Sequence, residues 1–173
     1  MWRLLLLVIV AGVITYFVPA PAVHHEANIE VDGQRTQVWK VVSDLNDLPR
    51  WNANAQGIQF ASSQRQGVGV EFSIPGQPFT HGFRVIGWEP YNKMQFRVTT
   101  KPALTVDHIM LFSLHTRGQK TIVRYIEEYR MKGGYLGYIL DQVYYSAVRR
   151  KGRTPALANL KRFVETGQGM FLP

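Results

Sequence analysis

The chain contains no cysteine among its 173 residues. Its fold therefore depends on neither disulfide bonds nor thiolate-bound metal ions. The sequence also lacks the nucleotide-binding patterns GxGxxG and Walker A, the zinc-hydrolase pattern HExxH and the nucleophile-elbow pattern GxSxG. These absences disfavour nucleotide chemistry and hydrolysis by a zinc ion or a serine nucleophile.

Charge is scarce at the start of the chain, where Arg3 precedes an uncharged apolar run over residues 4–18. Spanning a bilayer takes about 20 mainly apolar residues. Residues 2–21 reach that length if their flanking aromatic side chains lie in the headgroup layer. We therefore expect one transmembrane anchor or signal segment over residues 1–22 and one globular domain over residues 23–173.

A cleavable signal peptide is the alternative, because Ala20-Pro21-Ala22 places small residues where a signal peptidase cuts. Orientation follows from positive charge, since Arg3 precedes the apolar run and the next basic residue is Arg35. The sequence thus predicts a single-pass membrane protein whose domain lies on the non-cytoplasmic side. If the segment is cleaved, we expect an exported domain.

Basic residues outnumber acidic ones by 20 to 12, which gives a net charge of +8. This charge favours anionic lipid headgroups or acidic protein surfaces as partners. A solvated helix face is the ordinary interpretation of the basic residues near the C-terminus, and a surface facing lipid headgroups is the alternative. Aromatic residues do not interleave with this cluster, so we predict no nucleic-acid partner. The cluster comprises Arg149, Arg150, Lys151, Arg153, Lys161 and Arg162.

The spacing of apolar residues predicts an α+β domain. After short helical stretches over residues 34–51, apolar residues alternate with polar ones from Ile58 to Lys132, which predicts an antiparallel meander of strands with short turns. A helical period follows Gly133-Gly134, and we expect one side of that helix to be buried. Its apolar stripe comprises Leu136, Ile139, Leu140, Val143, Tyr144, Ala147 and Val148.

Several short motifs occur in a recognisable order along residues 27–166. They are Val38-Trp39, Ser43-Asp44, Pro49-Arg50-Trp51-Asn52, Gly67-Val68-Gly69, Trp88-Glu89-Pro90 and the segment 156–161. In this order the chain resembles the START-related helix-grip superfamily, in its polyketide cyclase/dehydrase and lipid-transport branch. The resemblance implies a curved antiparallel sheet wrapped around a long C-terminal helix, with a cavity between them for a lipid, polyketide, quinone or similar apolar molecule. Pro155 departs from it, because it interrupts a helix that is usually continuous in the family.

Strand alternation places Val106, His108, Met110, Phe112 and Leu114 on one face of a strand, and this face is apolar apart from the histidine. A solid core is the ordinary interpretation of such faces, and the resemblance favours a ligand-binding lining. The residues that we predict to line it are Val70, Phe72, Phe83, Phe96, His108, Met110, Phe112, Tyr125, Leu136, Leu140, Val143 and Tyr144.

His81, His108 and Glu127 are candidate proton-transfer groups if they converge on the cavity. His24-His25-Glu26 lacks a further ligand at a recognisable spacing, so we predict no metal site, and no cofactor is predicted either.

Three functions fit these observations. We favour membrane-anchored binding or transport of an apolar small molecule, which needs no chemistry. An accessory or structural subunit of a membrane protein complex is the first alternative, and a cyclase/dehydrase-type enzyme is the second.

Overall fold

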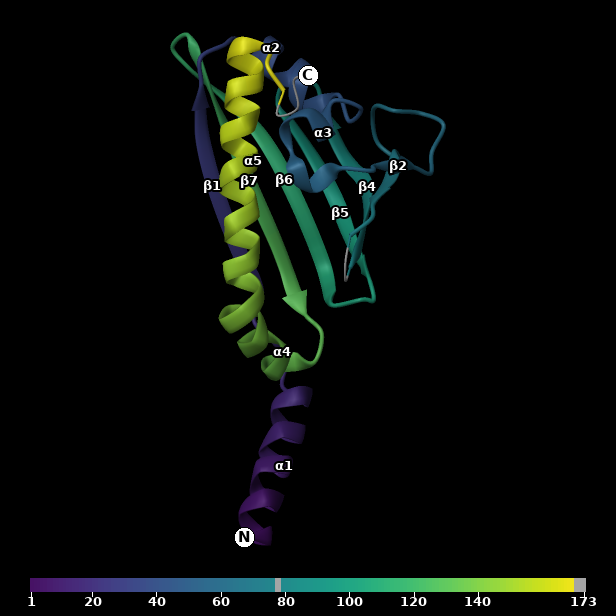
Figure 1. The fold of residues 1–173 in the computed structure, drawn as a ribbon, viewed down its shortest axis with the longest axis vertical. Coiled ribbons are helices and arrows are strands. Elements are labelled where there is room, and N and C mark those ends of the chain that lie inside the picture. Colours follow the sequence, from purple (N-terminus) through teal and green to yellow (C-terminus); the bar gives the residue numbers. More distant parts are fainter. Residues whose placement is uncertain (77–78, 170–173) are drawn as a thin grey trace.

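A computed structural model describes residues 1–76 and 79–169, and for residues 7–8 and 144–154 it describes the backbone alone. Figure 1 shows an elongated sheet with a long helix along one face and a separate N-terminal helix projecting from one end. The helices are α1 (Trp2–Phe17), α2 (Arg35–Ser43), α3 (Leu48–Trp51), α4 (Gly134–Leu140) and α5 (Ser146–Thr166), with a 3-10 turn η1 (Ala53–Ala55) and a π-helical turn η2 (Asp141–Tyr145). The strands are β1 (Val23–Val31), β2 (Gln59–Phe60), β3 (Glu71–Ile74), β4 (Thr80–Glu89), β5 (Lys93–Lys101), β6 (Thr105–Arg117) and β7 (Lys120–Met131).

The seven strands form one antiparallel sheet in the order β1-β7-β6-β5-β4-β3-β2. Consecutive strands from β2 to β7 are neighbours, and β1 adds to the edge at β7. Gly118 provides the left-handed backbone, with φ of 61°, that the tight β6–β7 hairpin requires. The predicted antiparallel meander is confirmed.

Two irregularities interrupt the strand pairing, between Val85 and Gly87 in β4 and between Val106 and Ile109 in β6. Each is of the kind that bends a strand and increases its twist. In β6 the extra residue shifts the alternation, so Val106 faces outward and is exposed while His108 is buried. The prediction that Val106 shares a face with His108 is therefore wrong.

The core lies between the concave face of the sheet and the helices α2, α3 and α5. Leu157, Leu160 and Phe163 of α5 are buried in it, and α5 continues through Pro155 to Thr166 without ending. Burying each such side chain is worth about 1.5–3 kcal/mol. The second half of α5 therefore holds the sheet and the short helices together.

Helix α4 presents its apolar residues to the outside. Leu136, Leu140 and Val143 are 39%, 54% and 77% exposed, so the predicted buried stripe is wrong over this stretch. The physical reason is that the helix docks through its opposite side, where Gly137 and Asp141 are buried. A Cβ at position 137 would overlap the Lys132 carbonyl oxygen, so only glycine permits this close approach.

Helix α1 is 16 residues long, and its apolar side chains are exposed all around it, from Leu4 near its start to Phe17 at its end. It joins the domain beside α4, where the Tyr135 amide donates a hydrogen bond of 2.9 Å to the Val18 carbonyl. Among the residues that the structure describes, no helix combines the length and apolar character needed to cross a membrane. The predicted transmembrane helix is thus not supported.

Candidate functional site

A histidine and a carboxylate meet in the interior of the domain. His108 Nε2 lies 2.8 Å from Glu127 Oε1, and the two side chains are only 6% and 7% exposed. They come from the neighbouring strands β6 and β7, and both point to the concave face because each occupies an inward position of its strand. Two of the three predicted proton-transfer candidates are therefore brought together.

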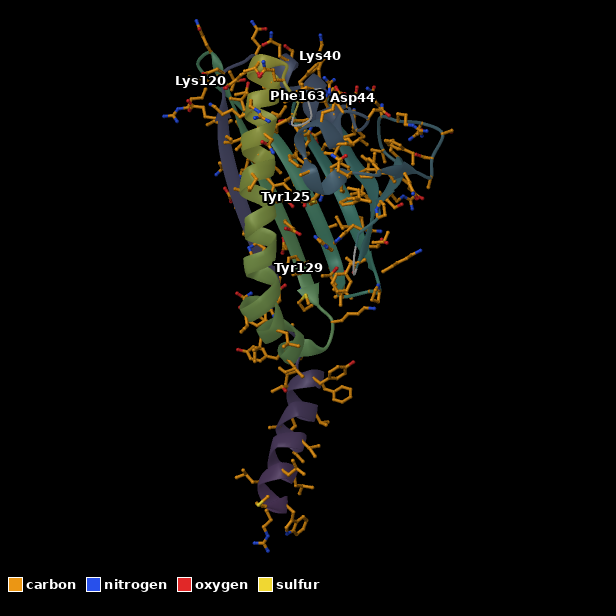
Figure 2. All side chains as sticks on the ribbon, viewed as in Figure 1. Lys40, Asp44, Lys120, Tyr125, Tyr129 and Phe163 are labelled. Atoms are coloured by element: carbon orange, nitrogen blue, oxygen red, sulfur yellow. The ribbon has the colours of Figure 1, made fainter. Side chains whose placement is uncertain are left out.

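A second polar pair adjoins the first. The Tyr129 hydroxyl donates a hydrogen bond of 2.8 Å to Asp141 Oδ2, and both residues are buried. His25 Nε2 lies 3.3 Å from the same hydroxyl, and the His108 and Tyr129 rings are 5.1 Å apart. Tyr125 and Tyr129 are buried residues of β7, and Figure 2 labels both beside α5. The polar cluster thus draws on β1, β6, β7 and the π-helical turn.

The cluster suits proton transfer or the orientation of a polar ligand group. A buried imidazole that contacts a carboxylate is held in one orientation, as the general acids and bases of enzymes are. Thr105 Oγ1 lies 3.4 Å from His108 Nδ1, so both ring nitrogens have a polar neighbour. Burial makes each of these contacts matter, because a buried polar group that loses its partner costs about 1–3 kcal/mol.

Sequence reasoning missed three members of this cluster. Tyr129 lies two residues beyond Glu127 in β7, and alternation alone places both on one face. Asp141 is the one acidic residue within the apolar stripe of residues 136–148, and a lone carboxylate there was a usable signal. His25 follows exposed His24 in the sequence. That His25 faces inward becomes clear only from the pairing of β1 with β7.

The predicted apolar lining on the sheet is a compact aromatic cluster. Phe72 stacks on Phe83 at 4.8 Å between ring centroids, and Phe112 packs against Tyr125 at 5.1 Å. Phe83 and Met110 remain half-buried at the edge of this cluster. The remaining members are deeply buried, so the structure brings all of these predicted residues into one concave face. Those buried members are Val70, Phe72, Phe96, Phe112 and Tyr125.

Other predicted site residues lie elsewhere. Leu136, Leu140 and Val143 lie on the outer surface of α4 and η2, away from the core. Tyr144 belongs to η2, but its side chain is outside the described residues. His81 lies on β4, which β5 separates from β6 and its His108.

The histidine pair near the N-terminus divides between the two faces of β1. His24 is exposed beside Glu26, and His25 points toward Tyr129. In the part of the chain that the structure describes, no group of three or more histidine, aspartate or glutamate side chains is placed to hold a metal ion. On the outer face, Arg124 donates hydrogen bonds of 2.9 and 2.7 Å to Glu26 and holds the pKa of that carboxyl below its usual value.

Two hollows lie at opposite ends of the domain. One, of about 490 Å³, is lined by residues 19–22 and by Val106, Arg130, Met131 and Gly134, beside α1. The other, of about 520 Å³, lies between the start of α2 and the β6–β7 hairpin. Neither hollow is lined by the predicted ligand-binding residues.

Comparison with known proteins finds no matching family model and no matching curated protein. Solved structures do match. Norcoclaurine synthase from Thalictrum flavum, in complex with dopamine and hydroxybenzaldehyde, superposes with a TM-score of 0.65 at 13% identity, over 88% of this chain and 91% of that one. The Aha1 dimer from Colwellia psychrerythraea gives a TM-score of 0.61 at 16% identity, over 85% of this chain and 99% of that one.

DynU16, from the dynemicin biosynthetic locus, gives a TM-score of 0.60 at 17% identity over 84% of this chain. The match covers 48% of DynU16, so this chain spans about half of its length. At such low identities the likeness shows the fold alone, and the predicted START-like architecture is confirmed at that level. The chain has a helix-grip fold, with a curved antiparallel sheet around its C-terminal helix.

Proposed function

We propose that the domain binds an apolar small molecule that carries one polar group. The observation that supports this is the His108–Glu127 pair, buried within a concave face that is otherwise largely apolar. An apolar lining with a few placed polar groups is the usual design of a small-molecule site. The polar pair would orient the ligand, and the aromatic cluster would bind its apolar part.

Phe83 and Met110 mark the part of this face that a ligand reaches first. Both are half-buried on the concave side, whereas their neighbours Phe96 and Phe72 are closed off. Met110 pairs with Glu127 across β6 and β7, so its side chain lies beside the polar pair. A ligand that contacts Met110 is therefore within reach of the imidazole and the carboxylate.

Membrane attachment through α1 belongs to the same proposal. The helix is apolar on every side and projects from the domain (Figure 1), as expected for a segment surrounded by lipid. An apolar molecule gains no hydrophobic free energy when it leaves a bilayer. The apolar face of the domain must therefore supply the same stabilisation as the lipid did, about 0.8 kcal/mol for each methylene group. Attachment would keep that face close to its source of ligand.

The direct test is native mass spectrometry and lipid extraction of the full chain, purified in mild detergent. We expect a stoichiometric apolar molecule, and Met110→Trp should displace it by filling the open edge of the face. Ile109→Trp is the matched control, because Ile109 is the adjacent half-buried residue on the opposite side of β6. Equal ligand content in both variants would contradict the assigned site.

Acid–base catalysis is the second candidate function, and the 2.8 Å contact between His108 and Glu127 favours it. In this scheme His108 takes a proton from the bound molecule or returns one to it, while Glu127 orients the ring and stabilises its charged form. Glu127→Gln keeps the shape and removes the negative charge. If the domain is an enzyme, the unmodified protein turns the ligand over, and this variant should bind the ligand but lose turnover. If the domain is a binding module, both proteins should bind the ligand and neither should turn it over.

A further inference from the structure

The outer face of α4 is an uninterrupted apolar surface. Tyr135, Leu136, Ile139 and Leu140 are each at least 39% exposed, and Val143 continues the same surface into η2 at 77%. Helical rotation of about 100° per residue places the four α4 side chains on an arc of about 140°. Residues 133–140 contain no charged side chain. Soluble monomers rarely expose such a patch unless it binds something.

This face is continuous with the apolar surface of α1. The Tyr135 amide bonds to the Val18 carbonyl, and a Cβ at Gly133 would come within 3.4 Å of the Tyr16 ring. Figure 1 shows α4 at the end of the domain from which α1 projects. One helix that is apolar on all sides and one that is apolar on its outer side therefore meet at a single junction.

The residues around the junction suit a bilayer surface. Tyr16 lies at the end of α1 and Tyr135 at the start of α4, both are exposed, and tyrosine side chains favour the headgroup layer. Lys132 is exposed immediately before α4. Cations beside an apolar face attract anionic headgroups.

We propose that the outer face of α4 rests in the surface of a bilayer containing anionic lipid, so that α1 and α4 together form the membrane-binding unit of the protein. This inference rests on the proposed membrane attachment and adds which face of the domain touches lipid. A protein partner fits less well, because a partner covers one side of a helix whereas α1 is apolar all around. An interfacial helix buries its apolar side by about 5–10 Å.

The orientation that results brings the polar cluster close to the membrane. Asp141 directly follows α4 and bonds to Tyr129, so the buried side of the same helical segment contacts the interior cluster. A molecule leaving the bilayer at α4 would therefore arrive at the end of the domain that holds Tyr129 and His108.

The chain has no native cysteine, so single labels can test this placement. A fluorophore is attached at Leu140→Cys, at Ile9→Cys in α1, or at Val68→Cys between β2 and β3, which is 58% exposed and serves as the matched control. The full chain is reconstituted into phosphatidylcholine vesicles containing phosphatidylglycerol. Quenching is then measured with a lipid-borne nitroxide and, separately, with aqueous iodide. Circular dichroism confirms that each labelled variant is folded.

We expect the nitroxide lipid to quench the label at position 140 about fivefold more strongly than the label at position 68, since only the former lies at the interface. If iodide quenches the label at position 140 while the nitroxide lipid quenches the label at position 9, the proposed placement of α4 is wrong, but membrane attachment through α1 still stands. Labels at both positions open to iodide overturn attachment as well. A label at 140 shielded from both quenchers shows that protein covers this face, which also overturns the proposal.

Discussion

The two ends of the domain differ in how they meet their surroundings. At the end distant from α1, Lys120 bonds to both Glu30 and Asp32, and Lys161 bonds to Glu165. At the end beside α1, residues 133–140 carry no charge, and apolar side chains face outward. Paired charges thus mark the surface of the distant end, whereas the outer side of α4 at the near end is apolar. The two ends therefore differ in the surface chemistry that they present.

Leucine provides the largest contrast between the two regions. Leu160 is fully buried in α5, whereas Leu140 is 54% exposed on α4. Leu160→Ala should lower the free energy of unfolding by about 2–5 kcal/mol, because it leaves a cavity in the core. Leu140→Ala should change it by about 0.5 kcal/mol or less. Urea denaturation checks both variants, and a large loss at Leu140 would mean that α4 packs inward.

Glycine gives a second contrast. Gly137→Ala should cost about 1–3 kcal/mol of unfolding free energy, because the new methyl group overlaps the backbone carbonyl of Lys132 and pushes α4 away from β7. Gly33→Ala at the distant end is the control, since its Cβ would make ordinary contacts of 3.5 and 3.6 Å with Gln37 and Val164. Thermal unfolding should show a lower midpoint for the first variant alone.

At the end of the domain beside α1, one tyrosine is buried and another is exposed. Tyr129→Phe removes the hydroxyl that bonds to buried Asp141 and should cost about 1–3 kcal/mol of unfolding free energy. Tyr135→Phe alters an exposed residue of α4 and should leave stability within about 0.5 kcal/mol. Equal effects in chemical denaturation would contradict a buried polar network beneath α4.

The smallest effect concerns the ion pairs of the distant end. Lys120 donates a hydrogen bond to Glu30 and holds the pKa of that carboxyl below its usual value. Its stabilisation is therefore complete above the pKa of the unfolded chain and is lost as the pH falls through the lower folded value. Glu30→Gln should flatten this acidic part of the stability profile slightly, since exposed pairs contribute little. An unchanged profile would show that the pair adds no stability.

The sheet and the long C-terminal helix followed from the sequence, because alternation and helical periodicity are local signals. The meeting of His108 and Glu127 was also accessible, since their positions on successive strands fix the face that each one occupies. Helical periodicity does not show which side of a helix is buried. The apolar stripe from Leu136 to Val143 does lie along one side of the helical segment. The opposite side contacts the domain, because Gly137 and Asp141 are buried there.

The N-terminal apolar segment shows a different limit of sequence reasoning. Apolar composition predicted a helix at the right place, but the helix ends at Phe17, before Pro19 and Pro21. Proline lacks the backbone N–H that a continuing helix needs, so the helix is shorter than the stretch of residues 2–21 that was expected to span a bilayer.

The extra residue in β6 places Val106 and His108 on opposite faces of the sheet. Strict alternation would keep Val106 and His108 on one side of the sheet, whereas here Val106 borders the hollow beside α1 and His108 lies in the interior. Asp107, with φ of 51°, is where the backbone changes side. Two residues apart on one strand, an outward valine and an inward imidazole connect the hollow beside α1 to the buried polar cluster through a short stretch of backbone.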